Sequence, residues 1–466
     1  MKKKNLSALA AAGLLASCFA VTGASAADLG GDCCADLEER VAELEATTAR
    51  KGNRKVSLTV SGFVAQQIIA WDDGQESNVY VTDTGSVSIG THFAFSGKAQ
   101  ITPDTEAGFM IKLEVINNDS LLVSQSSDDG ILNPGGNAQA LLTGSDGPIG
   151  LESAYWYVKS KTLGRVSIGT QSSAADNQAI LPDGSGSLVQ ANYVLYDSNA
   201  FFTRSNGAYT GVVWGFLANC HALDGYGGAF GDCDGVPNNN VRYDTPTFAG
   251  FSASASWGED DIWAVSGRYA GEFSGIKIAA AVAYHESSDE GGTGLATNGE
   301  AAANGGLDVG HLQVGGYLEH VPSGLWVYGA YANAYNDVTS SVRDGGTTNP
   351  DGEMFYVKAG IKGKWVPLGG TTIYGEYGQK DDAFTADMYD SGVNSSELEH
   401  YGVGIVQNID AAGMQMWLSW RHYEGDVGCA DASAIAGASC ADFGLASGNN
   451  SLEEFDLVKF GALIPF

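Results

Sequence analysis

Apolar and polar residues alternate along much of the chain, most clearly between Asn239 and His285. From Phe251 to Trp257, aromatic residues and alanines alternate with three serines. A period of two is that of a β-strand, whose successive side chains point to opposite faces. The polar side of these strands carries glycine, alanine and serine together with charged residues, which is a poor composition for a packed core. The stretch therefore predicts strands with one face toward lipid and the other toward a water-filled lumen.

The connections between the predicted strands are of two kinds. Seven are short and often contain Pro or Gly, near residues 103, 162, 246, 272, 322, 367 and 410, whereas the others are long, acidic and rich in Gly, Asn and Ser. Seven two-strand units plus a first and a last strand make sixteen strands. Outer-membrane barrels have short turns on one side and long loops on the other, and closure removes exposed strand edges. The predicted fold is all-β, a 16-stranded antiparallel transmembrane β-barrel over residues 55–466.

Composition narrows the environment of such a barrel. No apolar run near 20 residues follows the N-terminal segment, so the sequence predicts no membrane-spanning helix. The formal net charge of -31 leaves no basic face for phosphates, which excludes a nucleic-acid partner. Aromatic residues near the predicted strand ends suit the girdles that barrels place at both membrane interfaces. These are Trp71, Trp257, Tyr284, Trp365, Trp420 and Phe466.

The first 54 residues differ from the rest. Residues 1–26 combine a lysine-rich start, an apolar core and small residues from Ala24 to Ala26, which together predict an export signal. A competing cleavage site of the lipoprotein type ends at Cys18. Within residues 27–54, Leu37 to Leu44 has the spacing of a helical seam that is too short to be stable alone. We expect a short helix there, either self-associating beneath an oligomer or forming a solvated leader.

Six cysteines follow the predicted export signal. Cys33 and Cys34 are adjacent, and their pairing stays open. The other four form two close pairs in loop-like segments, and we expect each pair to form a disulfide beyond the inner membrane. These pairs are Cys220 with Cys233, and Cys429 with Cys440. No Cys-x-x-Cys motif occurs, so we expect no metal site, and nothing in the sequence indicates a cofactor.

One long connection breaks the rhythm of strands and turns. Residues 171–238 pass without a clear short turn, and a structureless stretch of that length is unusual unless it is functional. One interpretation is a loop folded into the barrel, which narrows the lumen and presents Asp176 and Asp183. The other is an extra hairpin, which would make the barrel eighteen-stranded. We favour the inserted loop.

Four parts of the sequence resemble the alphaproteobacterial general porins. They are Val56 to Gly74, Asn239 to Asp260, Arg268 to Gly275 and the terminal Phe466. The resemblance implies a trimeric, sixteen-stranded barrel in the bacterial outer membrane, surrounded by its lipid, whose third long loop constricts the pore. It also implies passive diffusion of small hydrophilic solutes and ions, and it gives Phe466 the role of a signal to the barrel-insertion machinery.

Selectivity in such a channel comes from lumen width and from charged groups that face each other across the narrowing. By strand parity, the inward-facing cations are Lys98, Lys112, Arg165, Arg242, Arg268, Lys358, Arg421 and Lys459. The opposing anions are predicted to be Asp176 and Asp183 on the long loop. The ion preference stays open, because a basic wall and acidic loops act in opposite directions.

Other functions have weaker support in the sequence. A barrel hydrolase would need a nucleophile beside a base, but no histidine near a strand has Ser or Asp at a telling spacing, so we do not expect an enzyme. These histidines are His92, His285, His311 and His400. A substrate-specific channel and a plugged barrel acting as a surface receptor or adhesin stay as alternatives. Saturable current would distinguish the first, and absence of conductance the second.

Overall fold

The computed structural model describes twelve segments of the chain. These are residues 56–85, 90–115, 118–128, 149–188, 198–218, 237–258, 262–290, 307–336, 351–384, 388, 391–430 and 439–466. The predicted export signal (1–26), the predicted helical leader (27–54) and the cysteines within it lie outside the described residues. The predicted Cys220–Cys233 disulfide lies outside them as well.

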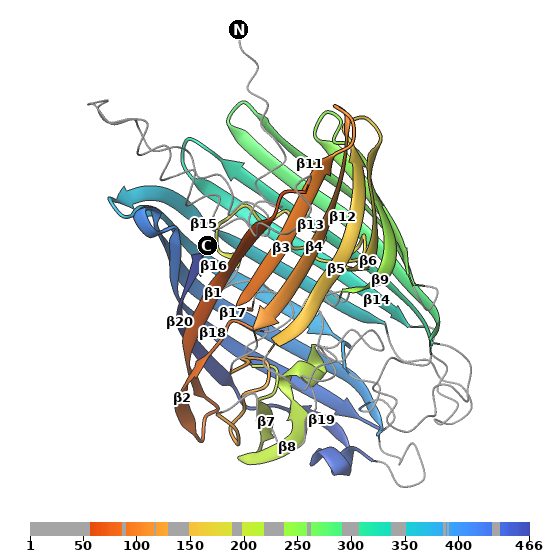
Figure 1. The fold of residues 1–466 in the computed structure, drawn as a ribbon. Helices are drawn as coiled ribbons and strands as arrows, with labels where there is room; N and C mark the ends of the chain where they lie inside the picture. The colour runs from red at the N-terminus through yellow and green to blue at the C-terminus, as the bar shows by residue number, and fades with distance from the viewer. Residues whose placement is uncertain are drawn as a thin grey trace.

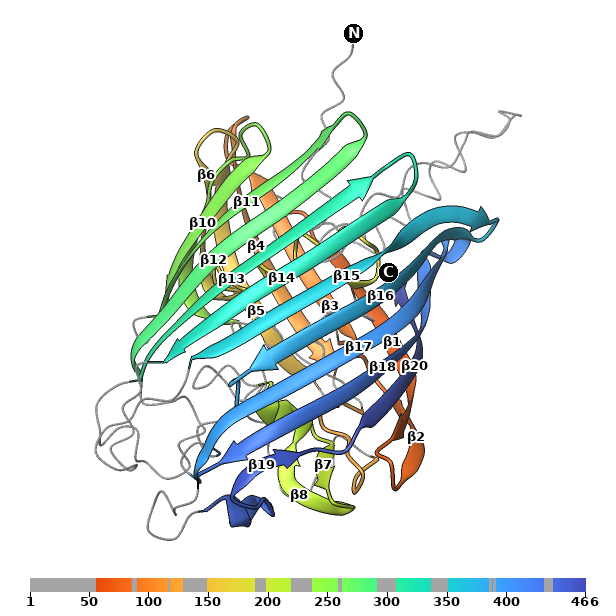
Figure 2. The ribbon, with the colours of Figure 1, turned by 180° about the vertical axis from the view of Figure 1, so that it is seen from behind.

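Sixteen strand positions close into a single antiparallel barrel (Figures 1 and 2). The strands are β1 (Thr59–Asp72), β3 (His92–Gln100), β4 (Thr105–Val115), β5 (Ile149–Ser160), β6 (Gly164–Gln171), β9 (Asn238–Asp244), β10 (Phe251–Gly258), β11 (Trp263–Phe273), β12 (Ile276–Glu290), β13 (Leu307–His320), β14 (Leu325–Asn336), β15 (Gly352–Val366), β16 (Gly369–Asp381), β17 (Val393–Ile409), β18 (Met414–Cys429) and β20 (Phe455–Pro465). The barrel closes because β1 pairs with both β3 and β20. The predicted strand number is therefore confirmed.

Two further short strands pair with the ends of barrel strands and add no new position around the barrel. β2 (Ser77–Thr82) pairs with the end of β1 beyond β3, and β19 (Gly448–Ser451) pairs with the end of β18 beyond β20. The sheet thus has eighteen strands, but these two add height at one end of the barrel rather than circumference. That end lies at the bottom of Figure 1, opposite the short turns.

All seven predicted short turns join neighbouring barrel strands. The turn between β17 and β18 contains a short 3-10 helix, η3 (Asp410–Ala412), and Gly413 ends it in a left-handed conformation. No helix within the described segments is long and apolar enough to cross a membrane.

The two faces of the barrel wall differ in exposure. On β1, Val64 and Ile68 are exposed on the outer face, whereas Ala65 and Ile69 are buried on the inner face. Outward aliphatic side chains recur around the barrel and suit contact with lipid, because the backbone polar groups are satisfied by strand pairing. Trp257 fits the predicted outer girdle, but Trp71 does not, since it is buried on the inner face.

The long connection between β6 and β9 is an insertion into the lumen. β6 pairs directly with β9, with Arg165 opposite Asp244, so the intervening residues add no strand to the wall. They contain a hairpin of β7 (Phe202–Ser205) and β8 (Ala208–Val213), followed by η1 (Trp214–Leu217), and this hairpin forms a separate two-stranded sheet. The inserted loop is therefore confirmed, and the eighteen-stranded barrel is wrong.

Candidate functional site

The described parts of the insertion form two arms, which we call the first arm (residues 172–188) and the second arm (residues 198–218). The first arm begins at β9 and β10. Both peptide carbonyls of Ser172 and Ser173 accept hydrogen bonds from the Arg242 guanidinium, at 3.2 and 2.7 Å. The N–H of Ala174 donates to Ser256 Oγ at 2.8 Å. A guanidinium with several rigid donors is well suited to hold a turning backbone in this way.

The first arm then crosses to β13 and β14. The N–H of Ala179 donates to Gln313 Oε1 at 2.9 Å, and its carbonyl accepts from the Tyr328 hydroxyl at 2.6 Å. Gly315 of β13 allows this close approach, because a Cβ there would lie 2.0 Å from the Ala179 carbonyl oxygen. The glycines on the inner face therefore give the arm space against the wall.

A buried ion pair joins the first arm to β15. Lys358 Nζ lies 2.7 Å from Asp183 Oδ2, and the two side chains are 0% and 2% exposed. The Lys358 ammonium also lies 5.6 to 5.9 Å from three aromatic ring centres, those of Trp326, Tyr328 and Tyr374. Rings at this distance attract a cation through their faces. The charge on Lys358 is thus compensated by one carboxylate within an aromatic enclosure.

Beyond Asp183 the arm turns along β15, β16 and β18. The carbonyls of Gly184, Ser185 and Gly186 accept from Lys362 Nζ at 2.7 Å, Thr372 Oγ1 at 3.0 Å and Gln415 Nε2 at 3.2 Å. Gly186 has a φ of +83°, a conformation that favours glycine. The first arm therefore follows the inner wall from β9 to β18, held by polar contacts.

The second arm is held by aromatic packing instead. The ring centre of Phe201 lies 5.3 Å from that of Trp71 and 5.0 Å from that of Phe455. Trp214 contacts Tyr423 and Phe455, with ring centres 5.9 and 6.2 Å apart. These buried side chains form a core between the arm and β1, β18 and β20. The sequence predicted small and polar residues on the inner face, and at this position that prediction is wrong.

An ion pair fixes the tip of the second arm. Arg204 of β7 donates to Asp73 at 2.8 Å and to Glu76 at 3.1 Å, both in the connection between β1 and β2. Its guanidinium lies 3.6 Å from the ring centre of Tyr209. Burial raises the pKa of Asp73, but hydrogen bonds from Arg204 and from the N–H groups of Glu76 and Gln75 lower this pKa below its usual value overall.

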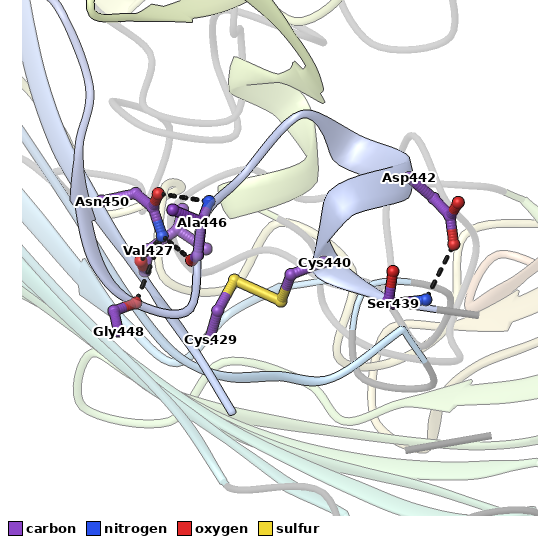
Figure 3. Close-up of a disulfide and its surroundings, with 8 residues drawn as sticks. All are labelled: Val427, Cys429, Ser439, Cys440, Asp442, Ala446, Gly448 and Asn450. Atoms are coloured by element: carbon purple, nitrogen blue, oxygen red, sulfur yellow. Dashed lines mark hydrogen bonds between the residues drawn. A yellow bond between two sulfur atoms is a disulfide. The ribbon is translucent and has the colours of Figure 1, made fainter. Parts of the chain in front are cut away.

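A disulfide fastens the connection between β18 and β20. Cys429 at the end of β18 bonds to Cys440 at the start of η4 (Cys440–Phe443), with their Cα atoms 6.2 Å apart (Figure 3). Ser439 and Asp442 cap η4 reciprocally, and the Asn450 side chain bonds the backbone of Ala446 and Val427. This predicted disulfide is confirmed.

The predicted wall cations fall into different surroundings. Arg242, Arg268 and Lys358 contact the first arm, and the partner of Arg268 there is Gln178. The other five predicted cations do not contact the first arm in the described residues. Arg421 pairs with Glu376, and Lys112 pairs with Glu152. Arg165 lies over the rings of Tyr155 and Tyr157, whereas Lys98 is exposed and Lys459 is buried. Of the predicted anions, Asp183 meets Lys358, whereas Asp176 accepts from its neighbour Asn177.

Strand parity could have identified two more cations. Lys362 shares the inner face of β15 with Lys358 and reaches both Gly184 and the Tyr317 hydroxyl. Lys380 of β16 is fully buried and donates to the carbonyl of Ala218 at the end of the second arm, at 2.8 Å. Arg204 had no such signal, because its role depends on a hairpin that joins no wall strand.

A closed sixteen-stranded barrel with an insertion along its inner wall is an outer-membrane channel of the diffusion type. Residues 8–416 match the family described as Gram-negative porin, so the chain belongs to that family. It is an outer-membrane porin, a channel rather than an enzyme, and it forms a water-filled path for passive diffusion of small hydrophilic solutes and ions.

Comparison with solved structures finds three outer-membrane proteins among those similar to this chain. The anion-selective porin from Comamonas acidovorans is 15% identical, with a TM-score of 0.51, covering 88% of this chain and all of that one. OmpF of Salmonella typhi in complex with daunomycin is 13% identical, with a TM-score of 0.48 over 88% of this chain and 98% of that one. OmpT of Vibrio cholerae is 10% identical, with a TM-score of 0.47 over 89% and 99%. The comparison with curated proteins gives no match.

Proposed function

We propose that the first arm and the four cations that hold it, Arg242, Arg268, Lys358 and Lys362, form the constriction of this porin. The observation that carries the proposal is the series of contacts from Arg242 on β9 to Gln415 on β18. Because the arm is held along the wall at this many points, the passage beside it keeps a fixed width. Solutes pass through the remaining water-filled space and need no catalytic group, so width and the local charge balance decide what crosses.

Most charges near this constriction are compensated in pairs. Lys358 meets Asp183, and Arg242 lies 2.9 Å from Asp244. Arg268 differs, because its contact on the arm is the neutral amide of Gln178. Asp176 and Asp244 also act on Arg268 electrostatically, but its direct contact on the arm is neutral, so we expect solutes and ions to experience its field more directly than that of Lys358 or Arg242.

Single-channel current across a salt gradient tests this constriction. We expect Arg268→Gln to change the reversal potential more than Lys98→Gln, a control cation that is exposed and remote from the arm. Equal reversal potentials for both variants and wild type would place the selectivity elsewhere. Current that is linear in salt concentration is expected for an open diffusion channel.

A substrate-specific channel is the second candidate. The observation that favours it is the aromatic core around Trp214 and Phe455, whose buried rings fill space on the inner face of β18 and β20. Current that saturates with salt and is blocked by one solute would favour this alternative. A folded barrel that carries no current would contradict both channel hypotheses and support a plugged receptor.

We also propose a subfamily, an oligomeric state and an export route for this porin. The stretch Arg242 to Phe251 supports membership of the alphaproteobacterial general porins, and with it a homotrimer. The export signal of residues 1–26 would deliver the chain to the outer membrane and its lipid. Phe466 at the C-terminus, whose backbone pairs with Gly62 at 3.0 and 3.2 Å, is the proposed signal to the insertion machinery. Cross-linking of the folded protein tests the trimer, which a purely monomeric species would exclude.

A further inference from the structure

A compact group of metal-ligating side chains lies on the outer face of the barrel, away from the lumen. His422 and Glu424 are two residues apart on β18 and therefore share one face. Glu454 comes from the connection between β19 and β20. His422 Nε2 lies 3.4 Å from Glu424 Oε1 and 3.9 Å from Glu454 Oε2, and all three ligand atoms lie within 4.8 Å of one another.

The His422 ring is held in one orientation by a carboxylate. Its Nδ1 lies 2.9 Å from Asp456 Oδ1, which also accepts from Trp420 Nε1 at 2.8 Å. Since a carboxylate only accepts, Nδ1 carries a proton, and Nε2 is the ring nitrogen that faces the two glutamates. A carboxylate that orients the remote nitrogen is the arrangement usual for metal-binding histidines.

The His422 nitrogen that faces the glutamates is buried, and it has no hydrogen-bond partner within the described segments. His422 is 6% exposed, and its Nε2 has no hydrogen-bond partner among the residues that the structure describes. A nitrogen that faces two carboxylates at this distance is stabilised when a cation, either a proton or a metal ion, lies between them. This buried nitrogen is an indication of a ligand that is independent of the acidic residues around it.

We propose that His422, Glu424 and Glu454 bind a divalent transition-metal ion of the zinc class. One imidazole and two carboxylates suit such an ion. Metal–ligand bonds of about 2.0–2.2 Å place tetrahedral ligands roughly 3.3–3.6 Å apart, so the pair at 3.4 Å already fits. The longer separation closes by a small movement of Glu454, whose side chain is 73% exposed. The fourth position would be left to water, and the rings of Trp420 and Tyr401 lie 6.0 and 4.9 Å from the His422 ring.

The bound ion would link two parts of the chain near the barrel seam. The backbone beside Glu454 is fixed, because the N–H of Leu452 donates to Gly425 at 2.9 Å and that of Glu453 to Arg204 at 2.7 Å. The metal therefore joins β18 to a connection that already contacts the second arm. The sequence predicted no metal site, because the third ligand lies 30 residues beyond Glu424 and belongs to another element.

Calorimetric titration with Zn²⁺ tests the proposal on the folded, detergent-solubilised full chain with its free thiols alkylated. We expect one saturable site per chain that is lost, or at least 100-fold weaker, in His422→Gln. Glu424→Gln and Glu454→Gln are expected to weaken it at least tenfold. The matched controls are His320→Gln and Glu353→Gln, an exposed histidine and an exposed glutamate at other strands, and both are expected to bind as wild type does.

Asp456→Asn tests the positioning residue separately. We expect Zn²⁺ affinity 10- to 100-fold weaker, while Co²⁺ in the same site keeps its visible absorption band and only its binding midpoint shifts. Circular dichroism establishes that each variant is folded. Wild-type protein with no saturable Zn²⁺ site would overturn the proposal, and so would His422→Gln binding as tightly as wild type, since that outcome assigns the metal to other residues. Neither result bears on conductance, so the porin function is tested independently.

Discussion

The first arm contacts the barrel wall through peptide carbonyls, a guanidinium and an ion pair, whereas the second arm contacts it through aromatic rings. Both arms belong to one insertion, and the hairpin of the second arm lies at the end of the barrel that also carries β2 and β19 (Figures 1 and 2). Polar contacts fix the backbone of the first arm at defined points, and none of its residues is exposed. Aromatic packing buries one side of the second arm, whose hairpin tip at residues 206–209 stays exposed. We infer from this difference that the first arm sets the width of the passage and that the second arm anchors the insertion.

The largest expected effect comes from breaking the buried ion pair of the first arm. Asp183→Asn leaves the Lys358 charge buried without a carboxylate, which costs about 3–5 kcal/mol. We expect amide exchange of the first arm to accelerate by two or more orders of magnitude, with larger and noisier single-channel currents. Lys364→Ala is the control, since Lys364 pairs with Asp410 at the exposed end of the same strand. Loss of such an exposed ion pair costs about 0–1 kcal/mol. Unchanged exchange in Asp183→Asn would contradict the anchoring role.

Truncation of the aromatic core is expected to act on the second arm. Trp214→Ala removes ring contacts with Tyr423 and Phe455, and we expect a cost of about 3 kcal/mol. This is near the low end for such truncations, because the Trp214 indole N–H has no hydrogen-bond partner among the described residues. Hydrogen exchange should increase in residues 198–218 and much less in residues 172–188. Equal acceleration in both arms would mean that the insertion opens as one unit.

Reduction of the Cys429–Cys440 disulfide is expected to have an intermediate effect. The bridge closes a loop with a sequence separation of 11, for which loss of the cross-link corresponds to about 2–3 kcal/mol. Urea unfolding with and without a reductant measures the change, and Cys429→Ser with Cys440→Ser is the matched variant. Conductance should stay as in wild type, because the bridge lies outside the first arm. A change in reversal potential on reduction would show that the two regions are coupled.

The smallest expected effect is a pH dependence at the tip of the second arm. The pKa of Asp73 is depressed in the folded protein, so its ion pair with Arg204 stabilises the hairpin above the unfolded value of about 3.9. That stability is lost as the pH falls through the lower, folded pKa. The protection factors of the β7 and β8 amides, which correct for the intrinsic pH dependence of exchange, should therefore fall below about pH 4 in wild type. Asp73→Asn should show fast exchange at every pH, and a wild-type profile that is flat down to acid would refute the role of this pair.

The sequence predicted the wall of this protein better than its interior. Alternation and turn chemistry are local, so the strand number, the seven short turns and the Cys429–Cys440 pair followed from neighbouring residues. Strand parity also placed Arg242, Arg268 and Lys358 on the inner face. Where both faces of a strand are apolar, parity gives no answer, and Trp71 on β1 was assigned to the wrong face for that reason.

The sequence by itself determined that a barrel forms, how many strands it has and that Arg242, Arg268 and Lys358 face inward. Only the tertiary structure decided what those residues meet. Asp183 and Lys358 are 175 residues apart, and their contact depends on the path of the first arm across several strands. The ligands His422 and Glu454 come together only where β19 and β20 join beside β18. Such contacts form only when segments far apart in the sequence meet in the folded barrel, and a local sequence pattern does not predict them.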